Sequence, residues 1–214
     1  SYDSPPYILL NFNGRMEDVF TLAHELGHSI HSYYSNKTQK YHYADYSIFL
    51  AEIASITSEL LLHFYLLRNS QNESLKKFLL NHIIDEFKAT VVRQTMFAEF
   101  ELIIHQKREH GEPLTADLLC DEYYKLIQKY FGNNVICDKL IELEWARIPH
   151  FHYGFYVYKY ATGFAAAAKF ANKIISGDSD APGLYKNFIS AGSSKDVIEI
   201  LKDSDIDITD ASFI

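Results

Sequence analysis

The sequence predicts a mainly α-helical fold of many helices, with one short strand near the N-terminus. Apolar residues recur every three or four positions through most of the 214 residues, which is the spacing of amphipathic helices. A short apolar run at residues 7–12 precedes an Asn-Gly turn and is expected to be a strand. With 48% hydrophobic and 22% charged residues, the chain is typical of a globular protein. It contains no repeat or linker, so we expect a single domain over residues 1–214.

The first two helices are expected at residues 16–34 and 46–67, where apolar positions follow helical spacing on both sides of a polar, aromatic loop. A long helical run is expected next, over residues 75–109. Gly111 and Pro113 end this run, because neither residue continues a helix well.

The second half of the chain is expected to consist of shorter helices. Thr115 is a plausible N-cap for a helix that extends to Tyr130, and Gly132 closes that helix. Further helices are expected at residues 138–145, 155–176, 183–189 and 194–202.

The first expected helix carries the sequence HELGH at residues 24–28. Side chains four residues apart share a helix face, so His24 and His28 can hold one metal ion between them. Glu25 emerges to one side, where its carboxylate can hold a water molecule that the metal activates. This spacing is the HExxH signature of zinc peptidases, and it predicts one zinc ion per chain with Glu25 as general base. A pair of core histidines is the alternative, but it would leave Glu25 and Glu52 unexplained.

The third zinc ligand is expected on the second helix. A catalytic zinc ion takes three protein ligands, whereas a structural one is closed by four Cys or His residues. The two cysteines lie far along the chain, and position 34, where metzincins place a third histidine, is Tyr34. Glu52 lies among apolar residues, and a carboxylate in such surroundings needs a partner that a zinc ion would provide.

Glu59 and His31 lie near the expected site without being expected ligands. Glu59 falls on the same helix face as Glu52, two turns later, and could accept a proton from the outer nitrogen of a ligating histidine. A buried acid bonded to Ser, Tyr or Arg explains Glu59 equally well. His31 rises about 10 Å along the helix from His24, which is too far for a shared metal, so we expect a structural or supporting role.

These segments resemble the oligoendopeptidase F branch of the thimet-oligopeptidase family. The resemblance rests on HELGHSIH at residues 24–31, FLAEIAS at 49–55 and Glu59. It extends through PYILLNFNG at 6–14, RIPHF at 147–151 and FYVYKYATG at 155–163. It implies a multi-helix zincin-type catalytic domain with a zinc-binding helix pair. It also implies an endopeptidase that hydrolyses short oligopeptides, with His24, His28 and Glu52 as zinc ligands and Glu25 as general base.

The resemblance also implies substrate-binding residues in the tyrosine-rich segment. In the family, a histidine and two tyrosines spaced seven apart donate hydrogen bonds to the substrate carbonyl and to the oxyanion. His150, Tyr153 and Tyr160 match this pattern. Spacing alone does not decide whether Tyr156, Tyr158 and His152 also face the substrate. Aromatic packing in a core is the alternative role for the tyrosines.

Composition restricts the partners and the compartment. A formal charge of −8, with acids gathered in residues 178–210, argues against nucleic acid as a partner. We expect no membrane span, because the longest alanine-rich run is interrupted by Lys169 and Lys173. Two cysteines do not form a disulfide framework, so we expect a cytoplasmic protein. Oligomeric state is not predicted.

The chain opens at Ser1 and reaches its first apolar run almost at once, so we expect it to be the C-terminal part of a longer peptidase. Two alternatives to an active peptidase follow. One is a zinc- and peptide-binding fragment that is inactive without an N-terminal region. The other is a helical interaction module whose histidines and tyrosines only pack together.

Overall fold

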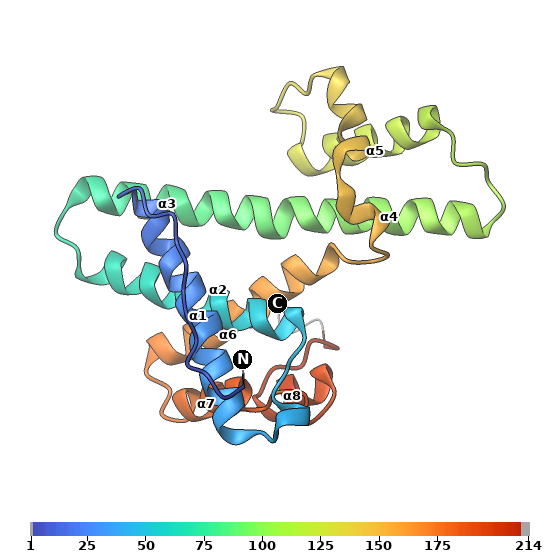
Figure 1. The fold of residues 1–214 in the computed structure, drawn as a ribbon. Coiled ribbons are helices and arrows are strands. Elements are labelled where there is room, and N and C mark those ends of the chain that lie inside the picture. Colours follow the sequence, from blue (N-terminus) through green and yellow to red (C-terminus); the bar gives the residue numbers. More distant parts are fainter. Residues whose placement is uncertain (1, 211–214) are drawn as a thin grey trace. The chain divides into compact units, whose positions relative to one another are not determined.

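The structure is a computed structural model that describes residues 2–210, and Figure 1 shows its helices. The described residues form eight α-helices, three short 3₁₀ segments and one π-helical turn. The contacts divide them into two compact units, which are described separately below. The first unit combines the residues up to Asn81 with those from Thr162 onward, and the second unit spans His82–Ala161. The mainly α-helical fold predicted from the sequence is confirmed.

The first unit is built around the pair α1 (Met16–Thr38) and α2 (Ile48–Asn69). The backbone N–H groups of Asn13 and Arg15 donate to the Asp18 carboxylate, which fixes the start of α1. A short 3₁₀ turn, Tyr41–Tyr43, precedes α2, and the Ser47 hydroxyl caps α2 by accepting from the backbone N–H of Leu50.

Three later helices complete the first unit. They are the C-terminal part of α6 (Tyr158–Ser176), α7 (Ala181–Ser190) and α8 (Val197–Asp203). Helix α7 packs against α1 and α8. The Tyr185 hydroxyl of α7 also donates to the carbonyl of Ala54 in α2, so α7 contacts both helices of the central pair.

The second unit contains α4 (Arg93–Glu109), α5 (Ala116–Phe131) and a 3₁₀ segment, Lys139–Arg147. Helix α3 (Glu73–Phe87) continues through a π-helical turn, Lys88–Val92, into α4, which matches the long helical run expected over residues 75–109. Thr115 caps α5 and Gly132 ends it with a positive φ of 69°, both as predicted. The buried core includes Met96, Phe97, Phe100, Tyr123, Leu126, Ile127, Ile148 and Val157.

Two expectations are wrong in detail. No strand forms within residues 2–210: residues 7–12 lack a partner segment, and Tyr7 and Leu9 are 85% and 97% exposed. The segment expected as a helix at 138–145 is a 3₁₀ helix, Lys139–Arg147. The absence of a membrane span stays a prediction, because helix α2 is long and apolar enough to cross a membrane by length and composition alone, although 44% of that window is buried inside the protein.

Candidate metal centre

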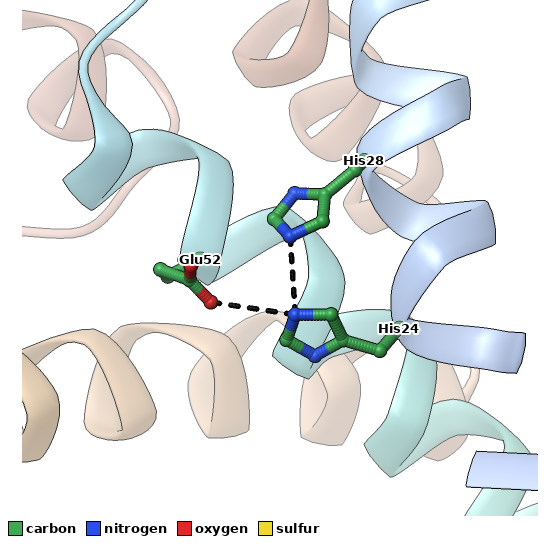
Figure 2. Close-up of side chains that lie close together, drawn as sticks. All are labelled: His24, His28 and Glu52. Atoms are coloured by element: carbon green, nitrogen blue, oxygen red, sulfur yellow. Dashed lines mark hydrogen bonds and ion pairs between the residues drawn. The ribbon is translucent and has the colours of Figure 1, made fainter. Parts of the chain in front are cut away.

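Helices α1 and α2 bring three potential metal ligands together. The ligand atoms of His24, His28 and Glu52 all lie within 4.8 Å of one another (Figure 2). His24 Nε2 is 3.0 Å from His28 Nε2 and 3.5 Å from Glu52 Oε2. Tetrahedral bonds of about 2.0–2.1 Å to zinc would separate two ligand atoms by roughly 3.3 Å. The three side chains therefore have suitable chemistry and come close enough together to hold a metal ion, and zinc stays the ion predicted from the sequence.

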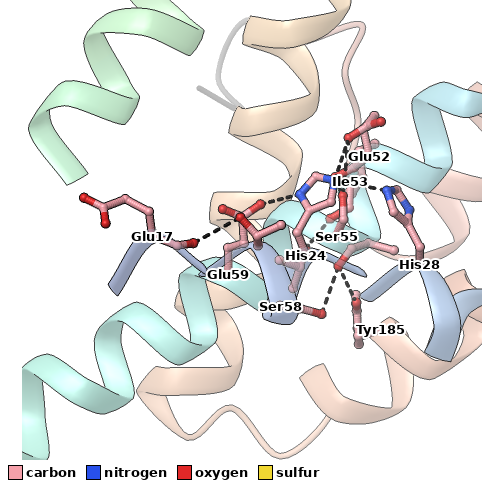
Figure 3. Close-up of polar contacts among 12 residues, drawn as sticks. Glu17, His24, His28, Glu52, Ile53, Ser55, Ser58, Glu59 and Tyr185 are labelled. Carbon is pink, nitrogen blue, oxygen red and sulfur yellow. Dashed lines mark hydrogen bonds and ion pairs between the residues drawn. The ribbon is translucent and has the colours of Figure 1, made fainter. Parts of the chain in front are cut away.

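Glu59 holds the ring of His24 from the other side. Its Oε1 lies 2.5 Å from His24 Nδ1, so Figure 3 shows the two carboxylates of α2, Glu52 and Glu59, on opposite nitrogens of one imidazole. When Nδ1 donates to Glu59, Nε2 keeps its lone pair and points at His28 and Glu52. This is the contact that the sequence suggested for Glu59.

The pKa values of His24 and His28 shift in opposite directions. Burial lowers the pKa of His24, but the hydrogen bond and charge of Glu59, with the charges of Glu52 and Glu25, outweigh it and raise this pKa above its usual value. Burial and the neighbouring His24 together lower the pKa of His28, although the same carboxylates oppose the shift. The site is thus rich in negative charge and suits a divalent cation.

The close approach of the two helices depends on Gly27. A Cβ atom at this position would lie 2.6 Å from the Cα of Ser55 and 2.9 Å from the carbonyl oxygen of Ala54. Both are backbone atoms, so α2 could not sit this close to α1 with any side chain at Gly27. Gly27 was not among the residues singled out from the sequence. The signal was present, because a glycine in the middle of a helix costs stability and usually has a packing reason.

His31 is not part of the cluster. It is 1% exposed, its ring stacks on Tyr46 at 3.7 Å, and within the described residues neither ring nitrogen has a hydrogen-bond partner. Burial, together with the charge of His28, lowers the pKa of His31 to about 3, so the ring is neutral. The structural role expected for His31 fits this environment. Glu25 is half-buried on α1, next to His24.

The second unit brings His150, Tyr153 and Tyr160 together, with Tyr156 among them. The His150 ring lies 5.9 Å from Tyr153 and from Tyr160 and stacks on Tyr156 at 5.6 Å. The Tyr160 hydroxyl is 3.3 Å from His150 Nε2. We call these four residues the His150 cluster. His152 is exposed.

Two buried glutamates of the second unit were missed by the sequence analysis. Glu101 is 1% exposed and accepts a hydrogen bond of 2.6 Å from the backbone N–H of Phe155, which fixes the loop beside the His150 cluster. Glu144 accepts from the Tyr123 hydroxyl at 2.6 Å and pairs with Arg93 and Arg147. Glu101 carried the same signal that identified Glu52, an acid in an apolar helix.

The fold and the cluster together define a helical protein in which two histidines and a glutamate could hold a metal ion. Residues 2–214 match the sequence profile of Peptidase family M3, and the chain belongs to this family, in its oligoendopeptidase F branch. The oligopeptidase PepF of Bacillus subtilis is 50% identical over 98% of this chain. The oligoendopeptidase F homolog of Borreliella burgdorferi is 45% identical over 98% of this chain.

Solved structures agree in fold. A putative peptidase from Chlamydophila abortus superposes with a TM-score of 0.93 at 46% identity over 100% of this chain and 36% of its own length. Oligoendopeptidase-F from Enterococcus faecium gives 0.83 at 44% identity over 92% of this chain and 36% of its own length. The chain spans 31% of the Bacillus relative and 36% of the Borreliella relative, so it matches about a third of these proteins.

Proposed function

We propose that this chain carries the catalytic centre of a zinc metalloendopeptidase that hydrolyses internal peptide bonds of short oligopeptides. The observation that supports it most directly is the convergence of His24, His28 and Glu52 within 4.8 Å on α1 and α2. Membership of Peptidase family M3 and the oligopeptidase names of its relatives support the reaction and the substrate class.

Separate residues would bind the metal and transfer the proton. His24, His28 and Glu52 would hold the metal, and Glu59 would keep His24 in the tautomer whose Nε2 is free to bind. Bound zinc would supply Lewis-acid chemistry, polarising the scissile carbonyl and making water more acidic. Glu25 takes the proton of the attacking water and passes it to the leaving amine.

The proposal assigns hydrogen-bond donation to the substrate to His150, Tyr153 and Tyr160. Neutral donors directed at developing negative charge stabilise a transition state more than a ground state. Their convergence within the second unit supports this assignment, because one substrate group could contact several members of the His150 cluster. A cytoplasmic location and the absence of nucleic acid partners stay predictions.

Metal content and turnover test the proposal together. We expect close to one zinc per chain by mass spectrometry of the purified protein, and loss of that zinc in His28→Ala. Glu25→Gln should keep the zinc and lower the cleavage of a fluorogenic oligopeptide by about 10²–10⁴-fold, the usual contribution of a general base. Near wild-type turnover in Glu25→Gln would show that another group is the base.

A zinc- and peptide-binding role without cleavage is the second candidate, because the chain spans only about a third of its relatives. The same measurements separate the two. A chain that contains zinc and binds peptide but does not cleave it, and that gains activity when the N-terminal region of a relative is added, has a binding role by itself. A chain that contains no zinc contradicts both candidates.

A further inference from the structure

The first unit contains a recess beside α1 that the proposed chemistry does not use. Its volume is about 620 Å³, and its lining includes Ser32 and Asn36 of α1 and the segment 41–46 that leads into α2. Ser32 and Asn36 follow His28 at intervals of four residues, so they continue the helix face of the metal ligands. At 1.5 Å per residue they lie about 6 Å and 12 Å beyond His28 along α1. We call this feature the Asp45 recess.

The lining of the Asp45 recess suits a cation. Asp45 provides a carboxylate that makes no ion pair within the described residues, and it accepts a hydrogen bond from the backbone N–H of Tyr46. Among the residues that the structure describes, no lysine or arginine lines the recess. Tyr2 and Tyr41 form an edge-to-face pair with ring centroids 5.5 Å apart, and Tyr41 is 70% exposed, so its ring is available to a ligand. A carboxylate beside open tyrosine rings favours an ammonium or guanidinium group.

Contacts from α1 and from Ser193 hold the segment 41–46 of the recess in place. The Ser35 hydroxyl donates to the carbonyl of Ala44, and the backbone N–H of Ser193 donates to the carbonyl of Tyr43. The hydroxyls of Ser32 and Tyr46 lie 2.6 Å apart, and Tyr46 also stacks on the buried His31. Such fixed walls reduce the conformational entropy lost on binding.

We propose that the Asp45 recess binds the lysine or arginine side chain of a bound oligopeptide, two to four residues away from the cleaved bond. An extended chain advances about 3.3–3.6 Å per residue, so the rise of roughly 6–12 Å from His28 to the wall residues Ser32 and Asn36 corresponds to this number of residues. The inference rests on the proposed function, because the metal centre fixes the position of the peptide. It adds a preference for basic residues that the metal centre itself does not explain.

Hydroxamate-capped peptides test the recess without requiring turnover, because a hydroxamate chelates zinc directly. Each peptide carries lysine, norleucine or glutamate at the second, third or fourth residue from the cap, and its Kd for the zinc-loaded 214-residue chain is measured by fluorescence anisotropy. At one position, lysine should bind about fivefold more tightly than norleucine, and glutamate more weakly than either. Asp45→Asn should reduce the lysine advantage to less than twofold, whereas the exposed control Asp180→Asn should keep it.

The outcomes separate this inference from the proposed function. Tight hydroxamate binding with equal affinity for lysine and norleucine at all three positions overturns the recess and leaves the peptidase proposal standing. A lysine advantage that persists in Asp45→Asn also overturns the recess as its source. Absence of binding by every hydroxamate, in a chain that contains zinc, overturns both.

Discussion

The candidate metal centre of the first unit and the His150 cluster of the second both contain histidine, but different interactions hold them. In the metal centre, polar atoms approach one another at 2.5–3.5 Å, from His24 to Glu59, His28 and Glu52. In the His150 cluster, rings meet at 5.6–5.9 Å, and the polar contact from His150 to Tyr160 is 3.3 Å. The first arrangement is specified by hydrogen bonds and charge, and the second mainly by aromatic packing.

The backbones that carry the two groups differ in the same way. The metal-centre residues project from two regular helices, whose spacing is fixed by the contact at Gly27. Part of the His150 cluster is carried by a loop in which Gly154 and Phe155 have positive φ values of 57° and 51°. Apart from the hydrogen bond from Phe155 to Glu101, residues 153–155 of this loop are exposed, so we expect the His150 cluster to adjust to a ligand more readily than the candidate metal centre.

Gly27→Ala tests whether the contact between α1 and α2 positions the candidate metal ligands, and we expect the largest effect from this substitution. The added methyl group meets the backbone of α2 at 2.6 Å, so the helices must move apart and carry Glu52 away from the histidines. We expect a loss of about 3 kcal/mol or more in the free energy of unfolding, at the upper end of the cost of overpacking. Zinc affinity should fall as well. Denaturant unfolding and zinc titration measure the two effects.

Gly183→Ala is the matched control for this prediction. Gly183 is also in a helix, but a Cβ atom there would have no neighbour within 4 Å. The substitution should be neutral or slightly stabilising, because alanine is the better helix former. Equal zinc affinity in Gly27→Ala and wild type would show that the helix contact does not position Glu52.

Tyr160→Phe tests whether the His150 cluster does more than pack. The substitution keeps the ring and removes the hydroxyl that lies near His150 Nε2. If that hydroxyl donates to the substrate, kcat/KM should fall about 100-fold, which corresponds to about 2.7 kcal/mol, in the range for loss of one oxyanion donor. The free energy of unfolding should change by about 1 kcal/mol or less, because the half-buried hydroxyl loses one hydrogen bond.

Tyr158→Phe provides the comparison for that measurement, because Tyr158 is 47% exposed and is not assigned a role. It should leave kcat/KM within twofold of wild type. A similar small effect in both variants would indicate that the tyrosines serve only as packing, which was the alternative reading of the sequence.

The sequence predicted the approach of the candidate metal ligands more completely than the geometry of the His150 cluster, for a physical reason. Helical spacing relates His24 to His28, and an acid in an apolar helix requires a partner, so Glu52 and Glu59 could be found without coordinates. The His150 cluster depends on a loop with positive φ, and period and spacing do not predict how such a loop folds. Glu144 could not be identified as buried, because its partners Tyr123 and Arg93 lie 21 and 51 residues away.

Glu144→Gln should have a smaller effect, confined to the second unit. The Glu144 side chain is 6% exposed and lies between Tyr123, Arg93 and Arg147. Loss of a fully buried ionic partner costs about 3–5 kcal/mol, but Arg147 is 70% exposed and solvent screens its charge, so we expect about 2 kcal/mol. Trp145, the single tryptophan, is adjacent in the chain and reports unfolding by its fluorescence. Zinc content should not change.

The dependence of this stability on pH provides the sharper measurement. Burial alone would raise the pKa of Glu144, but Tyr123 and the two arginines outweigh it and hold this pKa below its usual value. The folded state therefore binds the proton less tightly than the unfolded state does, so the stabilisation is present at neutral pH and is lost as the pH falls through the acidic range. Glu144→Gln should flatten this decline. Glu99→Gln, whose partner Lys129 is 61% exposed, should cost less than about 1 kcal/mol. An equal pH slope in Glu144→Gln and wild type would show that Glu144 does not hold the second unit together by its charge.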